Sequence, residues 1–184
     1  MSLLQPQTQS VTVFTIGHST RTIAEFGALL SEAKVEAIVD VRSTPRSRTN
    51  PQFNIDSLPG SLAEFGVGYQ HVPELGGRRH RARSAPPSPN TFWVNEAFRS
   101  YADYAATDAF SAGFATLQGL AHRSCCAIMC SEALWWRCHR RIISDYLLAQ
   151  GTDVLHILGP HKIDPAILTP NARRLSNGKL IYPA

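Results

Sequence analysis

The sequence predicts a single α/β domain built on an open, mainly parallel sheet with helices on both faces. Short apolar runs rich in β-branched residues alternate along the chain with segments whose apolar residues recur every three or four positions. At 184 residues, of which 43% are hydrophobic, the chain is long enough to bury its own core. The four cysteines all lie between Cys125 and Cys138, so a disulfide framework spanning the molecule is excluded and reduced thiols are expected.

The first three predicted elements form a strand, a helix and a second strand. Residues 11–17 (VTVFTIG) are β-branched and aromatic and stop at Gly-His-Ser-Thr, which predicts a buried strand that ends in a loop. Apolar residues at helical spacing follow over residues 23–30, and Thr22 and Glu25 have the spacing of a capping box. A second apolar run at residues 37–41 completes a unit in which both strands run parallel.

The rest of the chain continues this alternation. We expect a short helix, a third strand, two helices rich in aromatic residues, a buried strand, an amphipathic helix and a last central strand. Their predicted ranges are, in that order, residues 58–65, 69–72, 92–105, 109–122, 125–130, 140–148 and 154–158. An Asn177-Gly178 pair before Lys-Leu-Ile-Tyr predicts a small hairpin near the end of the chain.

Two segments fall outside this pattern. Residues 76–90 (GGRRHRARSAPPSPN) show no apolar periodicity and are rich in Arg, Pro and Ser, which predicts a long loop within one domain at residues 11–184. Residues 1–10 are expected to be a flexible N-terminus without the charged start and apolar core of a signal peptide. Because no apolar run approaches the roughly 20 residues that span a bilayer, we expect a cytoplasmic protein that does not bind membranes.

The basic residues favour an anionic ligand. Of the 18 basic side chains, 15 are Arg, whose planar guanidinium matches phosphate and carboxylate groups, although a GC-rich genome gives the same bias. They cluster after predicted strands or in loops, at positions 42, 46 and 48, at positions 78, 79, 81 and 83, and at positions 137, 140 and 141. We take these clusters, including Arg42, Arg46 and Arg140, as candidate anion sites.

The stretch CSEALWWRCHRR carries the strongest candidate chemistry. It leaves a predicted strand at Cys130 and enters a helix after Cys138 and His139. A thiol near a helix N-terminus and near arginines has a lowered pKa and forms a nucleophilic thiolate, so Cys130 or Cys138 is a candidate nucleophile, with Glu132 and His139 beside it. The same features also suit an anion site without covalent chemistry.

Polar residues follow two other predicted strands. Gly17, His18 and Ser19 end the first strand with backbone freedom, a group that exchanges protons near neutral pH, and a hydroxyl that binds anions. Asp40 and Arg42 lie on one side of the second strand, where they can form an ion pair. Since ligands in open α/β sheets bind beyond the carboxyl ends of the strands, these groups are expected at one rim of the sheet.

We expect neither a metal nor another cofactor. Cys130, Glu132, Cys138 and His139 are all possible metal ligands, but structural zinc sites usually show paired ligands such as C-x2-C, whereas seven residues separate Cys130 from Cys138 and no second pair follows downstream.

Six motifs occur in order along the chain: TIGHST, IVDVRSTPRSR followed by PQFN, YQHVPELGG, CSE, CHR and VLHI. Together they make the sequence resemble the bacterial domain-of-unknown-function family 488 from about Val11 to the C-terminus. The resemblance implies an intracellular α/β domain whose activity is not established. The family's motif positions fall here on Gly17, His18, Ser19, Asp40, Arg42, Pro45, Leu75, Gly76, Cys130, Glu132, Cys138, His139 and Arg140.

The chain also resembles, more weakly, rhodanese and cysteine-phosphatase domains. In those domains a strand similar to DVR precedes a strand that ends in Cys, and an Arg-containing loop cradles an oxyanion. Their loops are short and Gly-rich, commonly C-x5-R, whereas here Arg137 follows Cys130 by seven positions, with Trp135 and Trp136 between them. Sulfur or phosphoryl transfer is therefore an analogy.

Two functions remain open from the sequence. The first is a thiol-dependent transferase or hydrolase acting on a small anionic substrate that contains phosphate or sulfur, in which His18 or His139 moves protons. The second is a binding module for a nucleotide or nucleic acid, in which the arginines contact phosphates, a tryptophan stacks on a base and the cysteines are inert.

Overall fold

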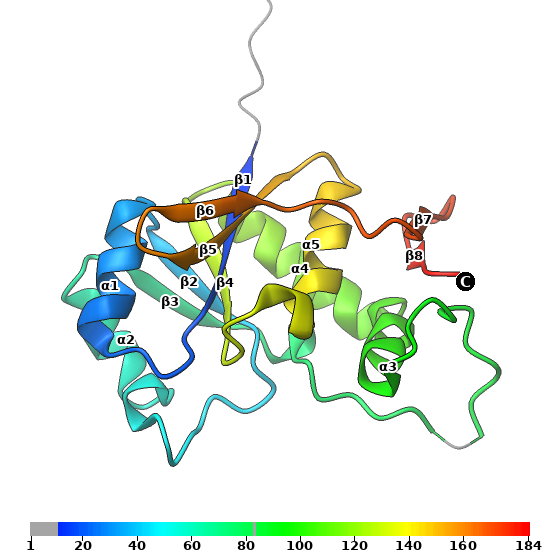
Figure 1. The fold of residues 1–184 in the computed structure, drawn as a ribbon, viewed down its shortest axis with the longest axis horizontal. Helices are drawn as coiled ribbons and strands as arrows, with labels where there is room; N and C mark the ends of the chain where they lie inside the picture. The colour runs from blue at the N-terminus through cyan, green and yellow to red at the C-terminus, as the bar shows by residue number, and fades with distance from the viewer. Residues whose placement is uncertain (1–10, 83) are drawn as a thin grey trace, which may run out of the picture.

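The computed structural model describes residues 11–82 and 84–184, and the expected flexible N-terminus at residues 1–10 lies outside them. Six strands form one sheet in the order β3-β2-β4-β1-β5-β6 (Figure 1). The first five in this order are mutually parallel, and β6 pairs antiparallel with β5 at the edge. The sequence prediction of one α/β domain with an open, mainly parallel sheet is confirmed.

The strands of the sheet, in chain order, are β1 (Thr12–Gly17), β2 (Ala37–Asp40), β3 (Gly68–His71), β4 (Cys126–Cys130), β5 (Asp153–Gly159) and β6 (Lys162–Pro165). Their burial explains their composition. Every residue of β4 is buried, as expected for a central parallel strand covered on both faces. All four residues of β6 are exposed.

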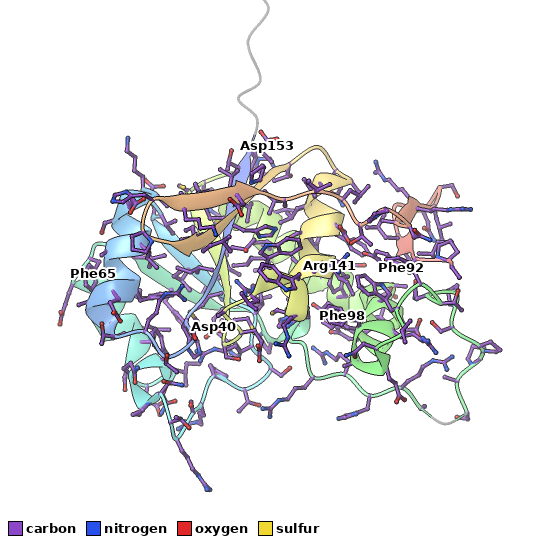
Figure 2. All side chains as sticks on the ribbon, in the orientation of Figure 1. Asp40, Phe65, Phe92, Phe98, Arg141 and Asp153 are labelled. Carbon is purple, nitrogen blue, oxygen red and sulfur yellow. The ribbon has the colours of Figure 1, made fainter. Side chains whose placement is uncertain are left out.

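Helices cover both faces of the sheet. The helices are α1 (Ile23–Glu32), α2 (Leu58–Ala63), α3 (Glu96–Ala105), α4 (Asp108–Ala121) and α5 (Arg140–Leu148). On one face, α1 and α2 pack on alternate strand residues such as Ile16 and Met129. On the other face, α4 and α5 pack on the intervening residues such as Val13 and Ile128, and α3 packs against α4 and α5 (Figure 1). Side chains fill both layers, with Phe65 beside α1 and Phe98 on α3 (Figure 2).

Most predicted helices and strands are found close to their predicted bounds. The capping box at Thr22 and Glu25 is formed, because the Thr22 hydroxyl accepts from Glu25 N and the Glu25 carboxylate accepts from Thr22 N. The expected hairpin exists as β7 (Arg173–Arg174) paired antiparallel with β8 (Leu180–Ile181). Within the described residues of 76–90 there is neither helix nor strand, as predicted.

Two predictions on elements were wrong. The helix expected from residue 92 begins at Glu96, because the Asn95 side chain accepts hydrogen bonds from Ala97 N and Phe98 N and caps the helix there. Strand β6 was missed, because an edge strand that is exposed along its whole length has no apolar pattern. Among the described residues, no helix has both the length and the apolar character needed to cross a membrane.

Candidate functional site

The carboxyl ends of three adjacent strands meet at one rim of the sheet. Strands β2, β4 and β1 are neighbours, and their hydrogen bonding continues into the loops that follow them. His18 N donates to Cys130 O at 2.9 Å, Ser19 N to Ser131 O at 3.0 Å, and Val41 N to Met129 O at 3.0 Å. These bonds hold the three loops in register, so residues far apart in the sequence form one rim, as expected.

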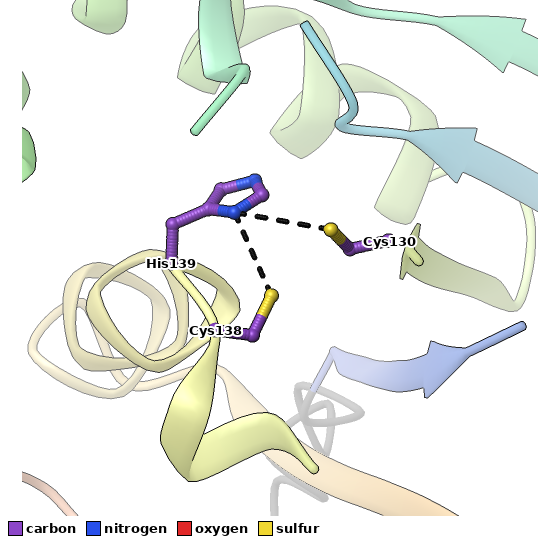
Figure 3. Close-up of side chains that lie close together, drawn as sticks. All are labelled: Cys130, Cys138 and His139. Carbon is purple, nitrogen blue, oxygen red and sulfur yellow. Dashed lines mark hydrogen bonds between the residues drawn. The ribbon is translucent and has the colours of Figure 1, made fainter. Parts of the chain in front are cut away.

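Two thiols and an imidazole lie together at this rim (Figure 3). Nδ1 of His139 lies 3.5 Å from Sγ of Cys138 and 3.9 Å from Sγ of Cys130. The other ring nitrogen, Nε2, lies 2.8 Å from the Val41 carbonyl oxygen. A carbonyl only accepts, so Nε2 carries a proton and donates it to Val41, which directs Nδ1 at the two sulfur atoms.

The two thiols have opposite pKa shifts. Interaction with the nearby Cys138 thiol, together with burial, raises the pKa of the Cys130 thiol to about 12. Burial raises the pKa of Cys138 as well, but interaction with Cys130 and the charge of Arg140 outweigh it and lower that pKa to about 6. Arg140 is 1% exposed, and its Nε donates to Cys138 Sγ at 3.4 Å. Cys138 is therefore the thiolate of the pair, and Cys130 holds the proton.

A second buried network joins Asp40, Arg42 and His18. The Arg42 guanidinium binds both Asp40 carboxylate oxygens, at 2.6 and 2.9 Å, and also donates to the Phe53 carbonyl at 2.7 Å. Another of its nitrogens lies 3.2 Å from Nε2 of His18, while Nδ1 of His18 lies 2.8 Å from the Ser19 carbonyl oxygen. His18 is held neutral, since burial lowers its pKa to about 4, and it accepts from Arg42. Asp40 lies in the interior of the molecule (Figure 2).

Glycines allow the loops of the rim to approach closely. A Cβ on Gly17 would collide with the backbone of Glu132 and Ala133, and a Cβ on Gly77 would collide with the His139 ring. Ser19 has a φ of 50°, in the left-handed region that side chains rarely adopt. Backbone strain of this kind is held in place by surrounding structure and concentrates at functional sites.

A cavity of about 410 Å³ opens at the rim. Seven of the predicted site residues line it: His18, Arg42, Arg46, Cys130, Glu132, Cys138 and His139. Gly17, Ser19, Asp40, Gly76 and Arg140 are not on its wall. Asp40 and Arg140 support it from behind, through the bonds to Arg42 and Cys138. Arg140 also donates to the Glu132 carbonyl.

Other residues of the wall were not named as site residues from the sequence. They are Ser43, Thr44, Ser47, Gly77, Arg78, Ala97, Phe98, Tyr101, Ser131 and Arg137. Arg78 and Arg137 belong to the arginine clusters, and Ser43, Thr44 and Ser131 closely follow predicted strands, so both groups carried a signal in the sequence. Ala97, Phe98 and Tyr101 of α3 carried no such signal in the sequence. Tyr101 lies edge-on to His139, with ring centroids 5.1 Å apart, a contact that depends on tertiary packing alone.

The three tryptophans differ in what they offer a nucleic-acid base. Trp93 is 5% exposed and packs under Arg141, whose guanidinium lies 4.8 Å from its ring. The Trp135 ring stacks on the His156 ring, with the ring centroids 4.2 Å apart. Trp136 is 43% exposed, so it is the one of the three whose ring is open to solvent.

The rim also contains a set of metal-ligand atoms. One donor atom from each of Cys130, Cys138 and His139 lies within 4.8 Å of the other two. Glu132, which the sequence offered as a fourth candidate, is not in this group. The expectation of no metal rested on the seven residues that separate Cys130 from Cys138, and the connection between β4 and α5 folds so that its two ends meet.

Comparison with known proteins gives one match. Neither the curated proteins nor the solved structures that were compared contain a match to this chain. A family model described as a domain of unknown function, DUF488, matches residues 22–147, which is more than half of the 184 residues and includes Asp40, Arg42 and the stretch from Cys130 to Arg141. The chain therefore belongs to the DUF488 family.

Proposed function

We propose that this protein is a cysteine-dependent enzyme that acts on a small anionic substrate containing phosphate or sulfur. The observation that carries the proposal is the position of the Cys138 thiol. It lies between the Nε–H of Arg140 and Nδ1 of His139, on the wall of a cavity that several arginines line. A cation and a base beside a thiol are the two features that activate a cysteine nucleophile.

The arginines of the wall support an anionic substrate. Arg42 is fixed by Asp40 and by the Phe53 carbonyl, so it presents a rigid charge. Arg46 is more loosely held by an exposed ion pair with Asp56 at 2.8 Å. Arg78 and Arg137 are exposed and complete the basic wall. Guanidinium groups bind phosphate and related oxyanions through paired, charge-assisted hydrogen bonds.

The proposed reaction is attack by the Cys138 sulfur on the phosphorus or sulfur atom of the substrate. A bond from Sγ to that atom forms, and the leaving group departs with the electron pair of the bond that breaks. Cys138 attacks as the thiolate, so no thiol proton is removed in this step, and the proton that Nδ1 of His139 took up when the thiol ionised is donated to the leaving group. His18 is assigned to positioning, because its lone pair is already used by Arg42.

The experiment is alkylation of the four cysteines by iodoacetamide at neutral pH, followed site by site with mass spectrometry. Without added anions, Cys138 should react faster than Cys125, which is partly exposed and whose pKa burial raises. Inorganic phosphate should slow the reaction of Cys138 and leave that of Cys125 unchanged.

Two arginine variants make the experiment specific. Arg137→Gln removes a charge from the cavity wall and should weaken phosphate protection about tenfold, equal to about 1.4 kcal/mol, because a charge-assisted bond is lost. Arg48 is exposed on the same loop as Arg46 but is not on the wall, so Arg48→Gln should leave protection as it is. If Cys138 reacts no faster than Cys125 while an oligonucleotide binds in a salt-dependent way, the proposal is wrong and the nucleic-acid module is supported.

A further inference from the structure

Beyond the proposed function, and independently of it, we propose that Cys130, Cys138 and His139 bind one divalent cation of the Zn²⁺ and Co²⁺ class. The carrying observation is that three soft or borderline donor atoms converge on one point from the two ends of the connection between β4 and α5, Cys130 at its start and Cys138 and His139 at its end (Figure 3).

The distances between the donors fit a tetrahedral ion. With metal-to-sulfur bonds of about 2.3 Å and metal-to-nitrogen bonds of about 2.0 Å, a tetrahedron places sulfur about 3.5 Å from nitrogen and the two sulfurs about 3.8 Å apart. In this protein Nδ1 of His139 lies 3.5 and 3.9 Å from the two sulfurs, and all three atoms lie within 4.8 Å of one another. Small side-chain rotations therefore suffice to reach ideal coordination.

The groups behind the donors also match a metal site. A metal-binding histidine commonly donates its second ring N–H to a carbonyl or carboxylate, which fixes the tautomer and aims the other nitrogen at the metal. Nε2 of His139 makes this bond to the Val41 carbonyl at 2.8 Å. Tyr101 packs edge-on against the ring and holds its orientation, and Arg140 Nε–H donates to the sulfur of Cys138 at 3.4 Å.

The chemistry of the donors selects the ion. Two thiolates and an imidazole favour Zn²⁺ and related transition metals over Mg²⁺ and Ca²⁺, which prefer oxygen ligands. Coordination removes the thiol protons, so the two sulfurs become anionic and neutralise the charge of the buried ion. Cys130 and Cys138 are only 7% and 3% exposed, and such neutralisation is what burial of a dication requires.

All three residues line the 410 Å³ cavity, so the fourth coordination position faces it. Three protein ligands with one open position is the arrangement of zinc sites that bind water or substrate. An anion held by the arginines of the wall can complete the coordination. An ion bound here also makes Cys138 a ligand, so metal binding and thiol attack exclude each other in one molecule.

The experiment is titration of the reduced, chelator-stripped full chain with Co²⁺ under anaerobic conditions. We expect one Co²⁺ per chain, with the thiolate charge-transfer absorption and the strong visible bands of tetrahedral Co²⁺, displaced by Zn²⁺. Cys130→Ser, Cys138→Ser and His139→Gln should each weaken binding by at least about 100-fold, because each removes a ligand. Cys125→Ser is the matched control, since Cys125 is outside the site, and it should bind as wild type does.

X-ray absorption of the wild-type Zn²⁺ complex keeps the test independent of how the variants fold. It should show two sulfur neighbours at about 2.3 Å and one nitrogen at about 2.0 Å. A shell of oxygen and nitrogen alone, or an absence of stoichiometric binding, overturns the inference. Phosphate-protected Cys138 reactivity without metal binding overturns this inference and leaves the proposed function. Metal binding by thiols that react no faster than Cys125 when stripped overturns the proposed function and leaves this inference.

Discussion

The buried side chain of His156 makes the stability of the folded protein depend on pH. It lies on β5, 1% exposed, with Nδ1 at 2.7 Å from the Thr15 hydroxyl on β1 and its ring stacked on Trp135. Burial, and then the charge of Arg140, lower its pKa from 6.5 to about 4. In the unfolded chain the same ring takes up a proton near pH 6.5, so acid favours unfolding.

Replacement of His156 should therefore make the free energy of unfolding depend less steeply on pH in acid. Between pH 6.5 and about 4 the unfolded chain binds a proton that the folded chain does not, and stability falls by up to about 1.4 kcal/mol per pH unit for this group. In His156→Asn, whose amide can keep the bond to Thr15, urea unfolding measured at several pH values should give a shallower slope.

The control for this prediction is His122, which is exposed at the end of α4. His122→Asn should keep the wild-type slope. Equal slopes for wild type and His156→Asn would mean that His156 takes up its proton without a penalty in the folded protein.

At the scale of elements, the junction between β1 and the loop after β4 depends on Gly17. A Cβ at this position would overlap the backbone of Glu132 and Ala133, which cannot rotate away as a side chain can. Gly17→Ala should destabilise the protein by about 1–3 kcal/mol through overpacking and should move the loop that carries Glu132. Thermal unfolding with phosphate titration will measure both effects.

Gly159 is the matched position for Gly17, because it also ends a parallel strand, yet a Cβ there meets nothing within 4 Å. Gly159→Ala should therefore leave stability and phosphate binding close to wild type. An unfolding temperature for Gly17→Ala equal to that of Gly159→Ala would contradict the close approach of the two loops.

How well an element could be predicted depended on how it is buried. Strand β4 and the core face of α1 bury their apolar residues, so a continuous run and a helical period identify them. Strand β6 buries none of its residues, and the start of α3 depends on the cap formed by Asn95, so the sequence pattern did not locate either.

The residues of the candidate site could be predicted only in part. The residues at strand ends, such as Arg42 and Cys130, were expected at one rim because parallel strands end on the same side of a sheet. The contact of His139 with the Val41 carbonyl, 98 positions away, depends on the order of the strands, which no local pattern encodes. The convergence of both thiols and the imidazole depends instead on how the connection between β4 and α5 folds, with its 3-10 turn at Trp135–Arg137, and spacing along the sequence does not give that fold.

The two ends of the described chain contribute to the same one of the two cores. The core on the α3, α4 and α5 side extends from Val13 on β1 to Tyr182 beyond β8, so the two ends of the described chain stabilise the same layer. We expect one cooperative unfolding transition. Far-UV circular dichroism, tryptophan fluorescence and reactivity of the buried thiols should give the same urea midpoint, and separate midpoints would show that the C-terminal hairpin unfolds on its own.

The place of β4 between β2 and β1 has a consequence for synthesis of the chain. The first two strands leave the ribosome long before the strand that pairs with both of them, so their facing edges stay without partners while the middle of the chain is made. Unpaired strand edges attract other chains, and pairings between distant segments form slowly. The nascent protein should therefore depend on chaperones until β4 has emerged. Only then can Cys130, the last residue of β4, reach the rim of the sheet that carries Arg42.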